Sequence, residues 1–262
     1  MVEPSDPLTE AFRLWDEGHS LSEISSELRI SRLRLRSWFV LPLDASARPS
    51  PRHEGIRHPR DVDAAGQCPV VARAPSSAYS YLLGQYLGDG WVSAMGPRGV
   101  FRLRIATCDA YPDIRQRCVD AVAAVMPANK VNIVPSIGCS EVGSYSKHWP
   151  CLFPQHGPGR KHERPIELAR WQQAIVEAYP REFIAGLIHS DGCRAINNVV
   201  TRGKAYSYPR YFFSNVSYDI LMLCAWAFDL IGVEWRQNRW NSLSVAKRDS
   251  VALLDTFIGP KA

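Results

Sequence analysis

Apolar positions along the chain form two matching helical segments about one hundred residues apart. The first is LLGQYLGDG at Leu82–Gly90, and the second is IAGLIHSDG at Ile184–Gly192. Apolar residues recur at helical spacing in both, and each segment ends in Asp-Gly. Small residues stand four positions apart in each segment, at Gly84, Gly88, Gly186 and Ser190.

Small residues at this spacing form a flat stripe on a helix, which lets another helix approach closely. We therefore expect the two segments to pack on each other and to bring Asp89 and Asp191 side by side at their ends. Two such carboxylates repel each other, and helix C-termini already carry negative partial charge. A divalent cation would balance them. The alternative is an ordinary helix stop with a left-handed glycine, which the repetition in the same register disfavours.

The pattern after each segment also repeats. Alternating and helical apolar positions predict strand, strand, helix, strand, strand and helix in the same order each time. The first set lies at 91–93, 100–108, 113–126, 130–135, 143–153 and 165–178, and the second at 193–200, 209–217, 218–231, 233–240, 242–247 and 250–258. The predicted fold class is α+β, an αββαββα unit duplicated over residues 78–178 and 179–262.

These two segments resemble the signature of the LAGLIDADG homing endonucleases. Matching positions are Gly84, Asp89 and Gly90 in the first, and Ala185, Gly186, Leu187, Ile188, Asp191 and Gly192 in the second. Leu87 and His189 replace an earlier signature Asp. The resemblance covers residues 78–262. It implies a saddle with pseudo-twofold symmetry, working as a monomer, in which the last Asp of each signature binds the catalytic metal.

Hydrolysis of a phosphodiester requires an activated water and neutralisation of the phosphate charge, and metals held by carboxylates supply both. Oxygen ligands at Asp89 and Asp191 suit Mg²⁺, or Mn²⁺ in its place. Lys147 and Lys247 follow the two acids at nearly equal spacings. The resemblance implies a basic catalytic residue near these positions. The alternative is that both are solvated lysines at strand ends.

The N-terminal part has a different pattern. Helical spacing over 8–17, 21–28 and 32–39 predicts a small helix-turn-helix domain within residues 1–41, with Arg32, Arg34 and Arg36 available to DNA. Any small helical bundle with an arginine face would have a similar pattern. Residues 42–77 are rich in Pro, Ala, Ser and Arg without periodicity, which predicts a flexible linker.

Polar residues on the predicted strands are candidates for DNA contact. A two-stranded ribbon fits the major groove, where Arg and Asn can bond base edges in pairs. An exposed sheet face would show the same alternation. The candidates are Arg102, Arg104, Arg194, Asn198, Arg210, Arg236, Asn238 and Arg239.

Composition adds three constraints. The net charge of +5 permits polyanion binding without requiring it. The seven cysteines include no CxxC pair, so we expect reduced thiols and no zinc site. The polar N-terminus and the lack of a long apolar run predict no signal peptide and no membrane span. We expect a cytoplasmic, nucleoid-associated protein.

Two functions fit these patterns. One is a sequence-specific endonuclease that uses a metal to cut double-stranded DNA, with the helix-turn-helix extending the target. The other is a transcription regulator on a catalytically retired scaffold, similar to WhiA-type regulators, which join the same domains in the opposite order. Retention of both acids favours the nuclease. The appended DNA-binding domain and the looser first signature favour the regulator.

Overall fold

The computed structural model describes residues 7–19, 21–30, 68–201 and 203–259. The chain divides into two compact units at residue 59. The described part of the first unit holds α1 (Pro7–Asp16) and α2 (Leu21–Leu28), which pack through Ala11, Leu14 and Ile24. The predicted third helix, with its three arginines, lies outside the described residues, so the helix-turn-helix stays a prediction.

The second unit contains the duplicated αββαββα order, which confirms the predicted fold class. The first copy runs α6 (Ser76–Asp89), β1 (Gly90–Ala94), β2 (Phe101–Cys108), α7 (Pro112–Val125), β3 (Val131–Ser136), β4 (Cys139–Ser146) and α8 (Trp149–Leu152). The second runs α10 (Pro180–Asp191), β5 (Gly192–Thr201), β6 (Lys204–Ser214), α11 (Tyr218–Leu230), β7 (Arg236–Arg239), β8 (Ser242–Val245) and α12 (Arg248–Asp255). Between them lie the 3-10 helix η2 (Lys161–Glu163) and α9 (Arg170–Ala178).

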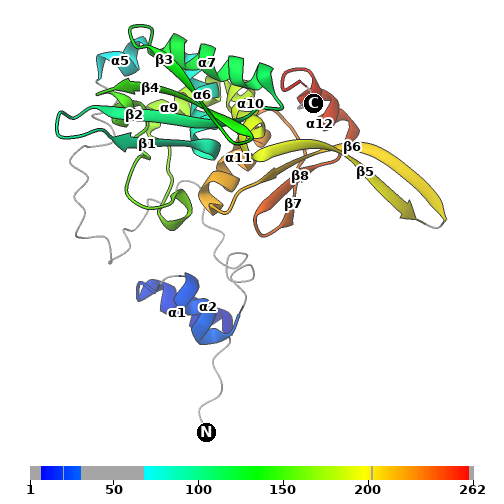
Figure 1. Cartoon of the computed structure of the whole chain (residues 1–262). Coiled ribbons are helices and arrows are strands. Elements are labelled where there is room, and N and C mark those ends of the chain that lie inside the picture. Colours follow the sequence, from blue (N-terminus) through cyan, green and yellow to red (C-terminus); the bar gives the residue numbers. More distant parts are fainter. Residues whose placement is uncertain (1–6, 20, 31–67, 202, 260–262) are drawn as a thin grey trace. The chain divides into compact units, whose positions relative to one another are not determined.

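Both copies form a four-stranded antiparallel sheet with the same strand order. These orders are β1-β2-β4-β3 and β5-β6-β8-β7. Figure 1 shows the two sheets and the long β5–β6 ribbon that extends beyond the second. Identical topology in the two halves supports the predicted internal duplication. None of the described helices is long and apolar enough to cross a bilayer.

Three boundaries differ from the predictions. The linker was predicted to reach residue 77, but α5 (Pro69–Arg73) lies within that range, since a proline suits the first helical turn. The strand predicted at 143–153 stops at Ser146, and the buried side chains of Trp149 and Leu152 belong to the helix α8. The strand predicted to begin at 209 begins at Lys204, because Pro209 is accommodated in the ladder opposite Ile196.

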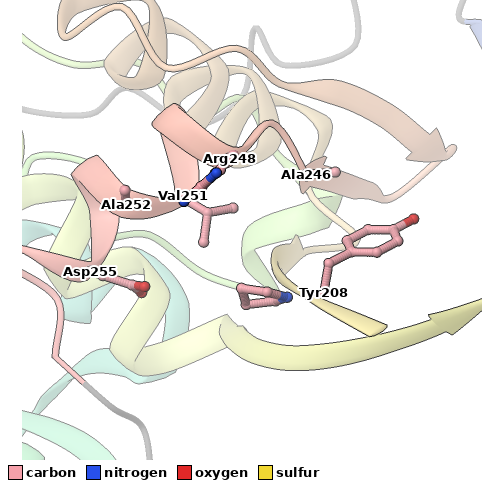
Figure 2. Close-up of a pocket in the computed structure, with 7 residues that line it drawn as sticks. Tyr208, Ala246, Arg248, Val251, Ala252 and Asp255 are labelled. Atoms are coloured by element: carbon pink, nitrogen blue, oxygen red, sulfur yellow. The ribbon is translucent and has the colours of Figure 1, made fainter. Parts of the chain in front are cut away.

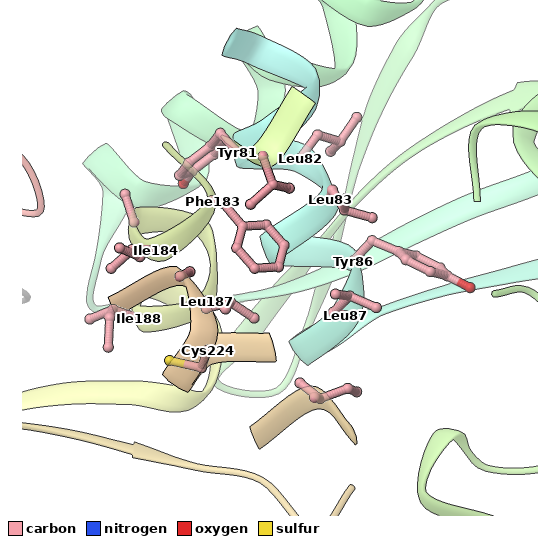
Figure 3. Close-up of a cluster of buried hydrophobic side chains, with 14 of the residues drawn as sticks. Tyr81, Leu82, Leu83, Tyr86, Leu87, Phe183, Ile184, Leu187, Ile188 and Cys224 are labelled. Atoms are coloured by element: carbon pink, nitrogen blue, oxygen red, sulfur yellow. The ribbon is translucent and has the colours of Figure 1, made fainter. Parts of the chain in front are cut away.

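The two signature helices pack against each other through their backbones. A Cβ atom at Gly186 would lie 2.2 Å from the Tyr81 carbonyl oxygen, and one at Gly84 would lie 2.5 Å from that of Phe183. Figure 3 shows the apolar side chains of α6 and α10 gathered around this contact. Larger residues at either glycine would therefore force the helices apart.

A buried polar network also joins the two helices. The Tyr81 hydroxyl lies 3.0 Å from His189 Nδ1 and accepts from Gln85 Nε2 at 2.9 Å. His189 Nε2 lies 2.9 Å from the Ile258 carbonyl oxygen, so the imidazole donates at that end and accepts from Tyr81 at the other. His189 stands where the signature has an Asp, and here it links α10 to the segment that follows α12.

We predict that Gly186→Ala lowers the free energy of unfolding by about 1–3 kcal/mol. Alanine has the higher helix propensity, so a loss would reflect the clash with the Tyr81 carbonyl alone. Chemical denaturation of both proteins measures the effect. Ala124→Leu, at an exposed position of α7, is the matched control and should leave stability unchanged. An equally stable Gly186→Ala protein would contradict the close packing.

Candidate functional site

Asp89 and Asp191 are the last residues of α6 and α10, and the glycine after each begins a strand. Gly90 and Gly192 have φ of −95° and −105°, so neither is a left-handed helix stop. A Cβ atom on Gly90 would lie 2.5 Å from the Cα atom of Tyr86, in the preceding turn of α6. The glycines therefore let each chain turn directly from helix into strand, with the carboxylate at the turn.

The contact between the helices continues down to the acids. A Cβ atom at Gly88 would lie 2.5 Å from Ser190 Cβ and 3.1 Å from the Oδ2 atom of Asp191. The Asp191 carboxylate thus lies against the residue that precedes Asp89. The close approach of the helix backbones places the two acids at the same end of the pair.

Asn215 orients the second acid. Its Nδ2 donates to Asp191 Oδ2 at 2.6 Å, while its Oδ1 accepts from the Ser217 backbone N–H at 2.7 Å. Since the amide is held at both ends, the position of the Asp191 carboxylate is fixed relative to the start of α11. Asn215 follows β6 and had no motif that indicated this role.

Lys161 places a cation beside the acids. Its Nζ donates to the carbonyl oxygens of Leu87 at 2.8 Å and Gly88 at 2.9 Å, and also to that of Tyr86. The carbonyls of Leu87 and Gly88 belong to the last turn of α6, where a helix leaves carbonyls without an intrahelical partner. The carbonyl of Tyr86 also accepts from the Gly90 backbone N–H. Lys161 therefore caps the C-terminus of α6 with hydrogen bonds next to Asp89.

The charge of Lys161 is set by opposing effects. Burial of the ammonium lowers the pKa of Lys161 to about 8, while Asp191 and Asp89 favour the charged form and Arg164 opposes it. The residue as a whole is part-buried, so the low value reflects the ammonium, which lies among carbonyls. A desolvated cation near two carboxylates partly balances their repulsion.

The loop that carries Lys161 is fixed by hydrogen bonds to its own backbone. Arg164 donates to the carbonyls of Gly159 at 2.7 Å and Gln155 at 3.1 Å, and Glu163 accepts from the Arg160 N–H at 3.2 Å. Sequence reasoning missed Lys161 because this loop has no periodicity, and its partners lie more than seventy positions away. The one sequence signal for Lys161 was its position shortly after the Gly-Pro-Gly turn at 157–159.

The two lysines predicted from spacing are both exposed. Lys147 is exposed in the turn after β4. Lys247 is also exposed and forms an ion pair with Glu234, which raises its pKa through that hydrogen bond. Asp249 is the other charge that raises the pKa of Lys247. The catalytic role of Lys147 and Lys247 stays a prediction.

The donors at this end of the helix pair suit a hard divalent cation. Carboxylate oxygens are preferred ligands of Mg²⁺, which needs few of them and keeps several waters. The site holds two carboxylates beside the Lys161 ammonium, and the helix ends add negative partial charge. Asp89 and Asp191 are therefore the residues that would hold a metal.

On the first sheet, Arg102 and Arg104 lie on the face opposite the buried Leu103 and Ile105. The Arg104 guanidinium stacks 4.6 Å from the Trp91 ring centroid and donates to the Ser93 hydroxyl at 3.1 Å. Arg102 lies 5.7 Å from the Tyr145 ring centroid and 3.4 Å from the Glu141 carboxylate. This face therefore carries cations held on aromatic rings.

On the second sheet, the candidates divide between the two faces. Arg210 lies opposite Ala195 and approaches the rings of Tyr208 and Phe212 at 5.5 and 5.6 Å. Because the next residue in β6, Tyr211, points into the core, the Arg210 side chain lies on the opposite face of the sheet. The β7 candidates Arg236, Asn238 and Arg239 are exposed.

Arg194, also predicted to contact DNA, is paired within the protein. It lies opposite the buried Tyr211, on the core face, and forms a bidentate pair with Asp255 of α12 at 2.8 and 3.0 Å. Asn198, four residues further along β5, shares that face. The alternation within β5 alone did not reveal which face the helices cover.

A cavity of about 370 Å³ lies between β6 and α12. Figure 2 shows Tyr208, Val251 and Asp255 among the residues that line it. Neither signature acid contributes to its lining. The cavity is therefore distinct from the candidate metal site.

We predict that Lys161 and Asp191 are energetically coupled. The change that Asp191→Asn makes in the free energy of unfolding should be more stabilising by about 0.5–3 kcal/mol in the Lys161→Met background than in the parent. The reason is that Lys161→Met removes the cation that balances the two acids. Denaturation of the four proteins of this cycle measures the difference. The exposed Lys147→Met serves as the control background. Equal effects of Asp191→Asn in all three backgrounds would contradict the assigned proximity.

Comparison with known proteins gives structural neighbours only. No protein-family model and no curated protein matches the sequence. I-DmoI in complex with DNA and Mn has a TM-score of 0.47 at 16% identity, covering 71% of this chain and 99% of that one. The LAGLIDADG meganuclease I-AabMI bound to uncleaved DNA has 0.43 at 10%, covering 68% and 82%. The N-terminal LAGLIDADG domain of WhiA has 0.41 at 11%, covering 79% and 93%. These neighbours are LAGLIDADG proteins of low sequence identity to this chain.

Proposed function

We propose that this protein is a metal-dependent endonuclease that hydrolyses phosphodiesters in a specific double-stranded DNA sequence. The observation that carries the proposal is the placement of Asp89 and Asp191 at the touching ends of two helices, with the buried ammonium of Lys161 beside them. Such a pair of acids destabilises the apo-protein through repulsion. It has a clear use in holding a cation opposite a phosphate backbone.

Each residue has a defined part in this proposal. Asp89 and Asp191 hold Mg²⁺ or Mn²⁺, which when bound supplies an activated water and neutralises charge on the phosphate. Asn215 holds the Asp191 carboxylate in place through its 2.6 Å hydrogen bond. Lys161 adds positive charge beside the two acids. We assign Lys161 the basic role that spacing had assigned to Lys147 and Lys247.

The open faces of the two sheets are proposed to bind the duplex. Arg104 and Arg210, held over aromatic rings, present guanidinium groups suited to phosphates and to guanine edges. Arg102, Arg236, Asn238 and Arg239 extend these surfaces. Duplication within one chain gives each half of the DNA its own sheet, so a monomer suffices. The predicted helix-turn-helix, with Arg32, Arg34 and Arg36, would lengthen the recognised sequence.

One observation favours a second function, a DNA-binding regulator without hydrolysis. The Lys161 ammonium supplies a cation to the acids from the chain itself. The site therefore has a partial charge balance that requires no metal, as a retired nuclease would need. Both functions share the same fold and the same DNA surfaces, and cleavage distinguishes them.

We predict that Asp89→Asn and Asp191→Asn each lower the rate of Mg²⁺-dependent cleavage by about a hundredfold or more, the scale of losing one electrostatic group at a transition state. Affinity for the same duplex in Ca²⁺ should stay equal or rise, because a carboxylate no longer repels phosphate. Selection from a library of duplexes supplies the substrate. The exposed Asp120→Asn is the matched control. Tight binding by the parent without cutting in Mg²⁺ or Mn²⁺ would favour the regulator.

We also predict that Arg104→Ala and Arg210→Ala weaken DNA binding and each reduce the slope of log affinity against log salt by about one. Arg194→Ala should leave that slope unchanged, since its guanidinium is paired with Asp255 on the opposite face. Fluorescence anisotropy between low and moderate salt measures the slopes. A parent slope near zero, or equal losses for all three variants, would contradict the assignment of the faces.

A further inference from the structure

A second group of metal-binding side chains lies outside the proposed nuclease site. The ligand atoms of Cys68, His148 and Cys151 all lie within 4.8 Å of one another. The Cys68 Sγ atom is 3.3 Å from His148 Nδ1. We propose that these three residues bind a structural Zn²⁺ ion, a site independent of the carboxylate pair and of its chemistry.

Local structure explains how the three residues meet. His148 is the residue before α8 and Cys151 lies within its single turn, where the Cys151 N–H donates to the His148 carbonyl at 2.9 Å. Side chains three positions apart on such a turn share one face. Cys68 is the residue before α5, and α5 packs beside α8. The two ends of the cluster are thus eighty positions apart in the sequence.

The ligand chemistry favours zinc over the hard cations. Thiolate and imidazole ligands suit Zn²⁺, whereas Mg²⁺ and Ca²⁺ take oxygen. Zn–S bonds of about 2.3 Å and Zn–N bonds of about 2.1 Å place tetrahedral S and N ligands about 3.5 Å apart. The observed 3.3 Å between Cys68 Sγ and His148 Nδ1 is close to that separation. Among the described residues the cluster supplies three ligands, and a fourth ligand would complete the tetrahedron.

The location of the cluster indicates what the metal would do. Cys68 packs against the core of the second unit, and Cys151 and Leu152 of α8 belong to that core. Zinc would fasten α5 to α8 at this point. The free energy of binding would then add to the stability of the fold. The spacing of the cysteines does not indicate this cluster, because its residues come from two separate segments.

Metal analysis of the purified full-length protein tests the proposal. After incubation with Zn²⁺ and desalting, the parent should retain one zinc per chain by mass spectrometry of the metal. Cys68→Ser, His148→Ala and Cys151→Ser should each retain far less. Cys193→Ser, at an exposed cysteine of β5, is the matched control and should retain it fully. Co²⁺ in place of Zn²⁺ should give the absorption bands of tetrahedral thiolate coordination in the parent and the control.

Other outcomes would overturn the proposal. These are a parent that retains no zinc, variants that retain as much as the parent, or a Cys68–Cys151 disulfide found by peptide mapping of parent handled under reducing conditions. Because a variant that fails to fold would also lose metal, the parent is tested by itself as well. Removal of zinc by a chelator should lower its melting temperature, and restored zinc should raise it again. An unchanged melting temperature would count against a structural site.

Discussion

The approach of α6 and α10 through glycine is the constraint on which the rest of the structure depends. With Gly84 and Gly186 in backbone contact, no side chain separates the helices, and their ends are brought to the same place. The next residues must turn at once into β1 and β5, which Gly90 and Gly192 allow. Both sheets therefore begin at the touching ends of the two helices, and their strand orders are the same.

This packing has an electrostatic consequence. Two helix C-termini and two carboxylates concentrate negative charge where the helices touch. The Lys161 ammonium balances part of this negative charge and donates to three carbonyls at the end of α6. Burial lowers the pKa of Lys161 to about 8, while the two acids favour its charged form. A bound divalent cation would neutralise more of the negative charge at the helix ends. The same three residues, Asp89, Asp191 and Lys161, thus affect both the stability of the fold and the chemistry proposed for it.

Sequence periodicity predicted what depends on short-range order. The signature helices, the strand pairs and the duplication follow from local apolar spacing, and they are observed. The small-residue stripes also predicted one contact across the chain, the packing of α6 on α10. Periodicity did not predict the other contacts between distant segments. Lys161 reaches α6 from an irregular loop, and Arg194 turns to Asp255 because helix α12 covers its face of β5. Nor did cysteine spacing show that Cys68 lies beside α8, since α5 and α8 meet only in the folded chain.

The central claim is that the ends of the two helices form a divalent metal site. Anomalous diffraction from crystals of the full-length protein grown with Mn²⁺ tests it most directly. We expect a peak about 2.1 Å from carboxylate oxygens of both Asp89 and Asp191, and its loss in crystals of Asp191→Asn. Crystals in which Mn²⁺ is bound elsewhere, while the Lys161 ammonium alone lies between the two carboxylates, would contradict the claim.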